Sequence, residues 1–290
     1  MKRVAFLAIV ILIAGAALYY GERTKAEAPI TPAPLMHVIA DAQREATRVP
    51  MAMTRLSDDE EIEAGNRIAS SYMTRFPRSA SGNDEAMAAY VELVGRKLAL
   101  NAHRRLPYRF HYVPEMGFAN AFAVPGGHVF IGKGLIAMMT SEDQLAGVLG
   151  HELEHVDHYH CAERLQVEAK LRRAPLGELV MLPIELFQAG YTKEQELEAD
   201  REGIRLASKA GYSATAAAEL FAEMEKRYHE HQIGAKSPEG EMSRVAFATL
   251  TEYFRSHPPA RERIAQIEHV AAEDGLPVRQ ERALKVALSG

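Results

Sequence analysis

The sequence has one cysteine, no tryptophan and no excess of positive charge. The scarcity of cysteine and of positive charge excludes several kinds of site and partner. Cys161 has no second cysteine to pair with, so an internal disulfide and a zinc cluster built from cysteines are both excluded. The net charge is −5, from 34 Lys and Arg against 39 Asp and Glu, which gives no reason to expect a nucleic-acid partner. Hydrophobic residues make up 47% and charged residues 25%, which excludes wholesale disorder and a collagen-like structure.

The N-terminus joins positive charge to an apolar run, because Lys2 and Arg3 precede residues 4–20, which carry no charge. A secretory signal peptide has this order, followed by small residues at a cleavage site. A retained membrane anchor fits as well, because a helix of this length reaches about 25 Å, almost the thickness of a bilayer core. We therefore expect residues 1–28 to be a signal peptide or an anchor. The rest is expected in the bacterial periplasm, either soluble or tethered to the inner membrane by that segment alone.

Hydrophobic spacing and turn residues organise the rest of the chain. Residues 29–56 are interpreted as a linker and N-terminal extension, residues 234–240 as a flexible loop, and residues 276–290 as a C-terminal tail. Helices are predicted at about 57–75, 84–101, 142–160, 162–173, 192–210, 214–231 and 259–273, and strands at about 107–113, 119–124 and 128–131. These elements predict one mostly helical α+β domain with a small sheet over residues 57–275.

Residues 151–155 read HELEH, an H-E-x-x-H sequence inside the predicted helix 142–160. His151 and His155 are four positions apart, about 40° around a helix and about 6 Å along it, so both imidazoles can bind one Zn²⁺. Glu152 lies beside them and can take a proton from a water on the metal. Chance alone gives the pentapeptide in roughly 5% of chains of this composition, so its surroundings matter. Ser141 with Gln144 is a capping pattern that begins the helix, and the helix has an apolar face, which places the motif inside a buried helix. The alternative is a pair of surface histidines on an ordinary helix.

A catalytic zinc holds three protein ligands and keeps one position open, so a third ligand is needed. The longer pattern H-E-x-x-H-x-x-G-x-x-H does not supply it, because Cys161 stands at its final histidine position. On the predicted helix 192–210, Glu196 and Asp200 share a face, whereas Glu198 points about 200° away. We predict Glu196 as the third ligand and Asp200 as the acceptor of a ring N–H from a ligating histidine. The alternative for Glu196 is a solvated surface charge.

Four segments in this order resemble one known family: residues 120–127 (NAFAVPGG), 151–155 (HELEH), 196–203 (ELEADREG), and His257-Pro258 with Arg263. Together they resemble the HtpX-type and CAAX-processing zinc endopeptidases, a gluzincin group marked by H-E-x-x-H and E-x-x-A-D. The sequence is most similar to the periplasmic branch with a single catalytic domain. The resemblance implies a zincin-like metallopeptidase fold with the small sheet beside the H-E-x-x-H helix. It also implies one Zn²⁺ per chain, and it agrees with the ligand set and with Glu152 as the general base.

The same resemblance places residues 257–263 near the metal and leaves their role open. His257 is a candidate fourth ligand that keeps the resting enzyme latent. The rival role is stabilisation of the transition state by His257 or Arg263, because a developing oxyanion needs a preorganised donor. A third interpretation is that the prolines at 258–259 simply begin a helix.

Asn120, Ala121, Phe122 and Ala123 form a candidate strand to which an extended substrate could add through backbone hydrogen bonds, the alternative being a structural hairpin. Such pairing tolerates varied side chains, so we expect polypeptide substrates, namely unfolded or misassembled envelope proteins. A non-cleaving chaperone-like protein and a structural zinc-binding protein of the envelope remain as alternatives. His158 is expected at the surface, and His160 in packing or in contact with a ligand rather than on the metal.

Overall fold

The computed structural model describes residues 56–74, 82–172, 191–234, 257 and 260–286. The predicted signal or anchor, almost all of the linker and the loop after residue 234 lie outside the described residues. In the part of the chain that the structure describes, no helix combines the length and the hydropathy needed to cross a bilayer.

The predicted helices and strands are confirmed to within a few residues at their ends. The helices are α3 (Asp58–Met73), α4 (Gly82–Ala99), α5 (Lys133–Ile136), α6 (Glu142–Asp157), α7 (His160–Arg172), α9 (Lys193–Lys209), α10 (Ala216–Gly234) and α12 (Ala260–Glu273). The strands are β1 (Arg109–Val113), β2 (Ala121–Val124) and β3 (His128–Gly132), with the 3₁₀ turn η1 (Pro125–Gly127) between the last two. The short helix α5 was not predicted from the sequence.

The predicted helix 142–160 is shorter than expected. Its N-terminus is where the capping pattern placed it, because the Ser141 hydroxyl accepts a hydrogen bond from the Gln144 amide at 3.0 Å. It ends at Asp157 because Tyr159 has a positive φ of 64°, which an α-helix cannot contain. The chain turns at this point, and α7 begins at His160 in a new direction.

The three strands form one sheet in the order β1-β3-β2. β1 pairs with β3 in parallel, β2 pairs with β3 antiparallel, and β2 is therefore an edge strand. The turn between β2 and β3 requires glycine, because Gly126 has φ 77° and a Cβ there would lie 2.8 Å from the Glu61 carbonyl oxygen on α3. This close contact fixes the β2–β3 hairpin against α3.

Side chains alternate between the two faces of the sheet and pack into two hydrophobic clusters. Phe122 and Phe130 are stacked on one face, where the Tyr72 ring of α3 meets both edge-on at 5.2 and 5.1 Å. The alternate residues, among them Ala121 and Ala123, belong to the larger cluster on the other face, which includes residues of α4, α6, α9, α10 and α12. The mostly helical α+β domain with a small sheet is thus confirmed.

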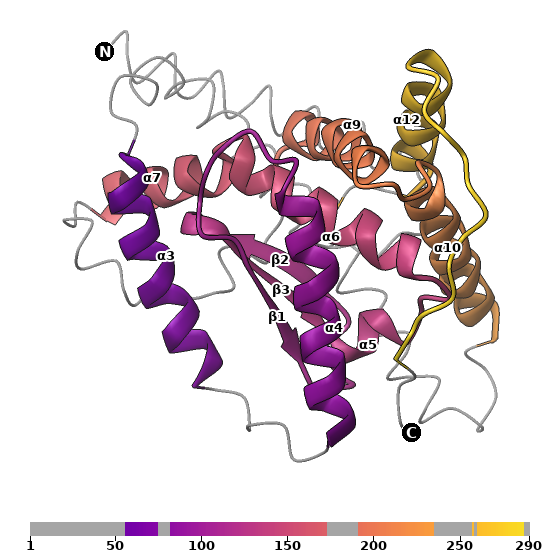
Figure 1. Ribbon diagram of the computed structural model, residues 1–290, viewed down its shortest axis with the longest axis horizontal. Helices are drawn as coiled ribbons and strands as arrows, with labels where there is room; N and C mark the ends of the chain where they lie inside the picture. Colours follow the sequence, from indigo (N-terminus) through magenta and orange to yellow (C-terminus); the bar gives the residue numbers. More distant parts are fainter. Residues whose placement is uncertain (1–55, 75–81, 173–190, 235–256, 258–259, 287–290) are drawn as a thin grey trace, which may run out of the picture. The chain divides into compact units, whose positions relative to one another are not determined.

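Helix α6 lies between the sheet and helices α9 and α10, and every one of its residues is buried (Figure 1). It meets α9 at two glycines, Gly150 and Gly203. A Cβ on Gly203 would lie 2.9 Å from the backbone nitrogen of His151, which is closer than real Cβ contacts allow. Two glycines therefore let α9 approach α6 directly beside the first histidine of the HELEH sequence.

Candidate active site

His151 and His155 lie one turn apart on α6 and direct their rings toward each other and toward α9. Their ring centroids are 4.8 Å apart, and the two Nε2 atoms are separated by 3.2 Å. Both residues are almost completely buried, with exposed fractions of 3% and 0%. Two Nε2 lone pairs directed at one point are the arrangement that a shared metal ion requires.

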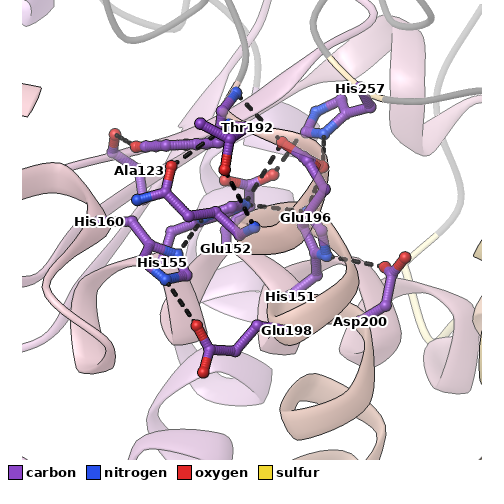
Figure 2. A network of polar contacts seen from close by, with 12 residues as sticks. Ala123, His151, Glu152, His155, His160, Thr192, Glu196, Glu198, Asp200 and His257 are labelled. Carbon is purple, nitrogen blue, oxygen red and sulfur yellow. Dashed lines mark hydrogen bonds and ion pairs between the residues drawn. The ribbon is translucent and has the colours of Figure 1, made fainter. Parts of the chain in front are cut away.

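Glu196 on α9 completes this group, as Figure 2 shows. Its Oε2 lies 3.4 Å from Nε2 of His151, and its Oε1 lies 3.7 Å from Nε2 of His155. A tetrahedral zinc ion with bonds of about 2.0–2.1 Å holds its ligand atoms about 3.3–3.4 Å apart. The two Nε2 atoms are 3.2 Å apart and each faces a different oxygen of Glu196, so the three side chains can hold one metal ion between them. Burial opposes the charge on Glu196, but His257 and His151 lower the pKa of its carboxyl well below the ordinary value.

Glu152 is buried beside the three ligand candidates, with an exposed fraction of 1%. Its carboxylate, a nitrogen of His151 and a nitrogen of His257 all lie within 4.8 Å of one another. Burial raises the pKa of Glu152 above the ordinary value, while His151 and His257 oppose the shift. A carboxylate with increased proton affinity, next to the candidate metal ligands, suits a general base.

His257 is brought into the same site from the segment before α12. Its Nδ1 lies 2.9 Å from Oε2 of Glu196, and its Nε2 lies 3.8 Å from Oε1 of Glu152. The ring is buried, with its centroid 5.4 Å from that of His151. With the imidazoles and carboxylates buried as well, the site is closed to solvent in this structure.

Asp200 and Arg263 contact the Nδ1 side of the His151 ring. Oδ1 of Asp200 is 2.9 Å from Nδ1 of His151, and the Arg263 guanidinium contacts both oxygens of Asp200 at 2.6–3.1 Å. Burial and Arg263 lower the proton affinity of His151, but Asp200 and Glu196 outweigh them and raise its pKa to about 9. An Nδ1–H that donates to Asp200 leaves Nε2 as the atom that can bind metal. Arg263 is 1% exposed, and its donors are directed mainly at Asp200.

His155 has its own supporting contacts, which the sequence did not reveal in full. Its Nδ1 lies 2.9 Å from Nδ1 of His160, whose Nε2 lies 3.1 Å from Oε2 of Glu198 (Figure 2). On a continuous helix His160 would point about 140° away from His155. The left-handed Tyr159 breaks that helix, which brings His160 back against the ligand. Glu198 points away from the candidate metal ligands, as predicted, yet it contacts His155 through His160.

Tyr191 is a site residue for which the sequence gave no signal. Its ring stacks on His155 with centroids 3.9 Å apart, and its hydroxyl lies 3.1 Å from Sγ of Cys161 and 3.5 Å from the Ala123 carbonyl oxygen. Cys161 is buried, and this contact with Tyr191 is made inside the core. Tyr191 thus joins α6 to β2.

The candidate substrate strand at residues 120–123 lies at the edge of the sheet. The Gly132 amide donates to the Asn120 carbonyl oxygen, so the antiparallel alternation turns the backbone groups of Ala121 and Ala123 away from β3. Asn120 accepts the Ala121 amide through its own side chain at 2.9 Å. Both alanines are buried, so this edge is covered in the structure.

Comparisons with known proteins identify the family of this chain. The model of the family described as peptidase family M48 matches residues 85–271. The mitochondrial metalloendopeptidase OMA1 of Schizosaccharomyces pombe is 28% identical over 236 residues, which cover 76% of this chain and 65% of that protein. The beta-barrel assembly-enhancing protease of Escherichia coli (strain K12) is 28% identical over 213 residues, covering 65% and 42%. That of Yersinia pestis is 31% identical over 156 residues, covering 46% and 32%.

The matched regions span about a third to two thirds of the length of these relatives. The family match covers the sheet, the HELEH helix, the helix that carries Glu196, and most of α12. It bears out the resemblance drawn from the sequence and the zincin-like metallopeptidase fold expected from it. The chain belongs to peptidase family M48.

Proposed function

We propose that this protein is a zinc-dependent endopeptidase that hydrolyses peptide bonds of unfolded or misassembled envelope proteins. The observation that carries the proposal is the meeting of His151, His155 and Glu196, whose donor atoms lie at the separations of zinc ligands. We assign one Zn²⁺ per chain to these three residues. The family and its metalloendopeptidase relatives support the reaction class.

When bound, zinc lowers the pKa of a water molecule toward about 7 and polarises the scissile carbonyl. Glu152 accepts the proton of the attacking water and passes it to the leaving amine. Asp200 and His160 keep the two histidines in the tautomer that presents Nε2. Arg263 acts through Asp200 in this scheme, because its guanidinium is engaged with that carboxylate.

The resting enzyme is latent in this proposal, and His257 is the residue that maintains latency. Its Nδ1 contacts the Glu196 carboxylate at 2.9 Å, and the whole site is buried. A movement of the segment that carries His257 would free Glu196 and Glu152 and open the site to substrate. The rival role, in which His257 stabilises the transition state, predicts the opposite effect of its removal.

An extended polypeptide substrate is proposed to pair with β2 through the outward backbone groups of Ala121 and Ala123. Because Tyr191 contacts the Ala123 carbonyl, this pairing requires Tyr191 to move. Two of the relatives are named as beta-barrel assembly-enhancing proteases, which supports an envelope substrate and a periplasmic location. The domain boundaries and the N-terminal signal or anchor predicted from the sequence are part of the same proposal.

Cleavage of unfolded casein by the purified protein, with and without a chelator, tests this function. We expect cleavage that stops on chelation and returns with added Zn²⁺, while circular dichroism shows that the fold persists. A fold that is lost on chelation, in a protein that never cleaves, would identify a structural zinc site instead.

A further inference from the structure

A second group of metal-ligating side chains lies at the C-terminal end of α6, apart from the catalytic ligands. His103, Glu154 and Asp157 each offer one ligand atom, and these atoms all lie within 4.8 Å of one another. His158 is next to them, with its Nε2 3.3 Å from Oε2 of Glu154. We call these four residues the α6-end cluster. They come from α6, from the residue after it, and from the turn that follows α4.

The two closest pairs in the α6-end cluster, the His103–Asp157 hydrogen bond and the Glu154–His158 ion pair, have separations close to those of zinc ligands. Nδ1 of His103 lies 3.1 Å from Oδ2 of Asp157, and the Glu154–His158 pair is separated by 3.3 Å. Tetrahedral zinc with bonds of about 2.0–2.1 Å spaces its ligand atoms about 3.3–3.4 Å apart. Neither Oε2 of Glu154 nor Nε2 of His158 makes a hydrogen bond, although both atoms are buried.

Oε2 of Glu154 faces the His158 ring at 3.3 Å but not in hydrogen-bond geometry, and a cation bound between them would satisfy both buried atoms. The Glu154 side chain is only 1% exposed, so solvent does not provide the missing donors. Asp157 is held in place by the backbone amides of His103 and Arg104, each at 2.7 Å. The Asp157 carboxylate is thus fixed in position, and Oε2 of Glu154 is the oxygen that can accept a cation.

The α6-end cluster is also accessible, which the catalytic site is not. The His103 side chain is 66% exposed and that of His158 is 29% exposed, so an ion can enter between the two rings, whose centroids are 6.4 Å apart. Two imidazoles and two carboxylates form a donor set that suits Zn²⁺ better than Mg²⁺ or Ca²⁺, which prefer oxygen ligands alone.

We propose that His103, Glu154 and Asp157 form a second, solvent-accessible Zn²⁺ site, with His158 beside Glu154 as a candidate fourth ligand. It is connected to the catalytic site through Glu198, whose Oε1 lies 3.7 Å from Nδ1 of His158 and whose Oε2 contacts His160. Occupancy of the α6-end cluster therefore bears on the same glutamate that supports His155. The site is defined by its own ligands and does not depend on the proposed peptidase activity.

Zinc titration of the metal-free protein, followed by calorimetry and by zinc content after dialysis, tests this site. We expect the wild-type protein to bind two equivalents, one that resists dialysis and one that is weaker. His103→Asn, and the double variant His103→Asn with His158→Asn, should weaken the second equivalent by at least about tenfold, while the first equivalent still resists dialysis.

The matched control is His269→Asn. His269 forms the same kind of i,i+4 pair with Glu273 at 3.5 Å, but no third ligand candidate accompanies that pair among the described residues. His269→Asn should bind two equivalents like the wild type. Because His103 is largely exposed, its single variant is expected to keep the fold, which circular dichroism checks. The proposal is overturned if the wild-type protein binds one equivalent only, or if both His103 variants bind the second equivalent with wild-type affinity.

Discussion

Asp200 accepts a hydrogen bond from His151 at 2.9 Å and is itself held by the guanidinium of Arg263. All three side chains are almost completely buried, and Arg263 also packs on the Phe221 ring at 4.1 Å. The result is a fixed order of contacts from Arg263 on α12 through Asp200 on α9 to Nδ1 of His151 on α6. This order explains why an arginine with no access to solvent lies so close to a proposed zinc site.

The first prediction concerns Asp200→Asn, which keeps the shape of the side chain but removes its charge. We expect zinc affinity to fall about 10–100-fold, because His151 loses the partner that fixes its tautomer. Competition with a chromogenic chelator measures this affinity, and casein cleavage should recover in excess zinc. Glu194→Gln, an exposed carboxylate in the first turn of the same helix, is the control and should change neither. Unchanged zinc affinity in Asp200→Asn would remove Asp200 from the site.

The second prediction concerns His257→Ala. If His257 keeps the enzyme latent by contact with Glu196, its removal should increase casein cleavage and produce self-cleavage products over time. Gel analysis of the purified variant, alone and with casein, measures both. A loss of cleavage at unchanged zinc content would instead assign His257 to stabilisation of the transition state.

The third prediction concerns the contact between the two helices that carry the ligands. Gly203→Ala places a methyl group 2.9 Å from the backbone of His151, so α9 must shift. We expect a loss of about 1–3 kcal/mol in the free energy of unfolding, together with weaker zinc binding. Gly82→Ala is the control, because a Cβ at Gly82 meets no atom within 4 Å. Equal unfolding midpoints in urea for the two variants would contradict the close approach.

The fourth prediction is a pH dependence of stability that is separate from the metal site. Nε2 of His111 lies 2.9 Å from Nδ1 of His128, whose Nε2 lies 3.0 Å from the Asn66 side-chain oxygen. This chain of contacts is satisfied when both rings are neutral. Burial is the largest cause that lowers the pKa of each histidine from 6.5 to about 4.

Between pH 6.5 and pH 4 the unfolded chain therefore binds more protons than the folded one, so acid favours unfolding. The contribution of the neutral His111 and His128 rings to the free energy of unfolding is fully present above pH 6.5 and is lost as the pH falls toward 4. His111→Phe removes one of the titrating rings and keeps the stacking on Phe130, which has a centroid distance of 4.5 Å. Urea unfolding at pH 7.5 and pH 5 should show a smaller acid loss in this variant. An equal loss in variant and wild type would contradict the assignment.

Most of the fold and the centre of the site were predictable because they rest on local patterns. The HELEH spacing needs only a helix, and Glu196 with Asp200 needs only a second helix whose small residues allow close approach. The contacts of His160 and Tyr191 were not predictable in the same way. His160 reaches His155 only because Tyr159 adopts a left-handed conformation, and Tyr191 lies on His155 through the tertiary arrangement of α7, α9 and β2. Periodicity contains no information about either.

The measurement that tests the central claim most directly is casein cleavage by Glu152→Gln, with zinc content determined in the same preparation. Glu152 contributes a proton acceptor and no metal ligand in this account, so the variant should retain the zinc of His151, His155 and Glu196 and lose cleavage. A variant that cleaves casein at the wild-type rate with its zinc in place would contradict the account.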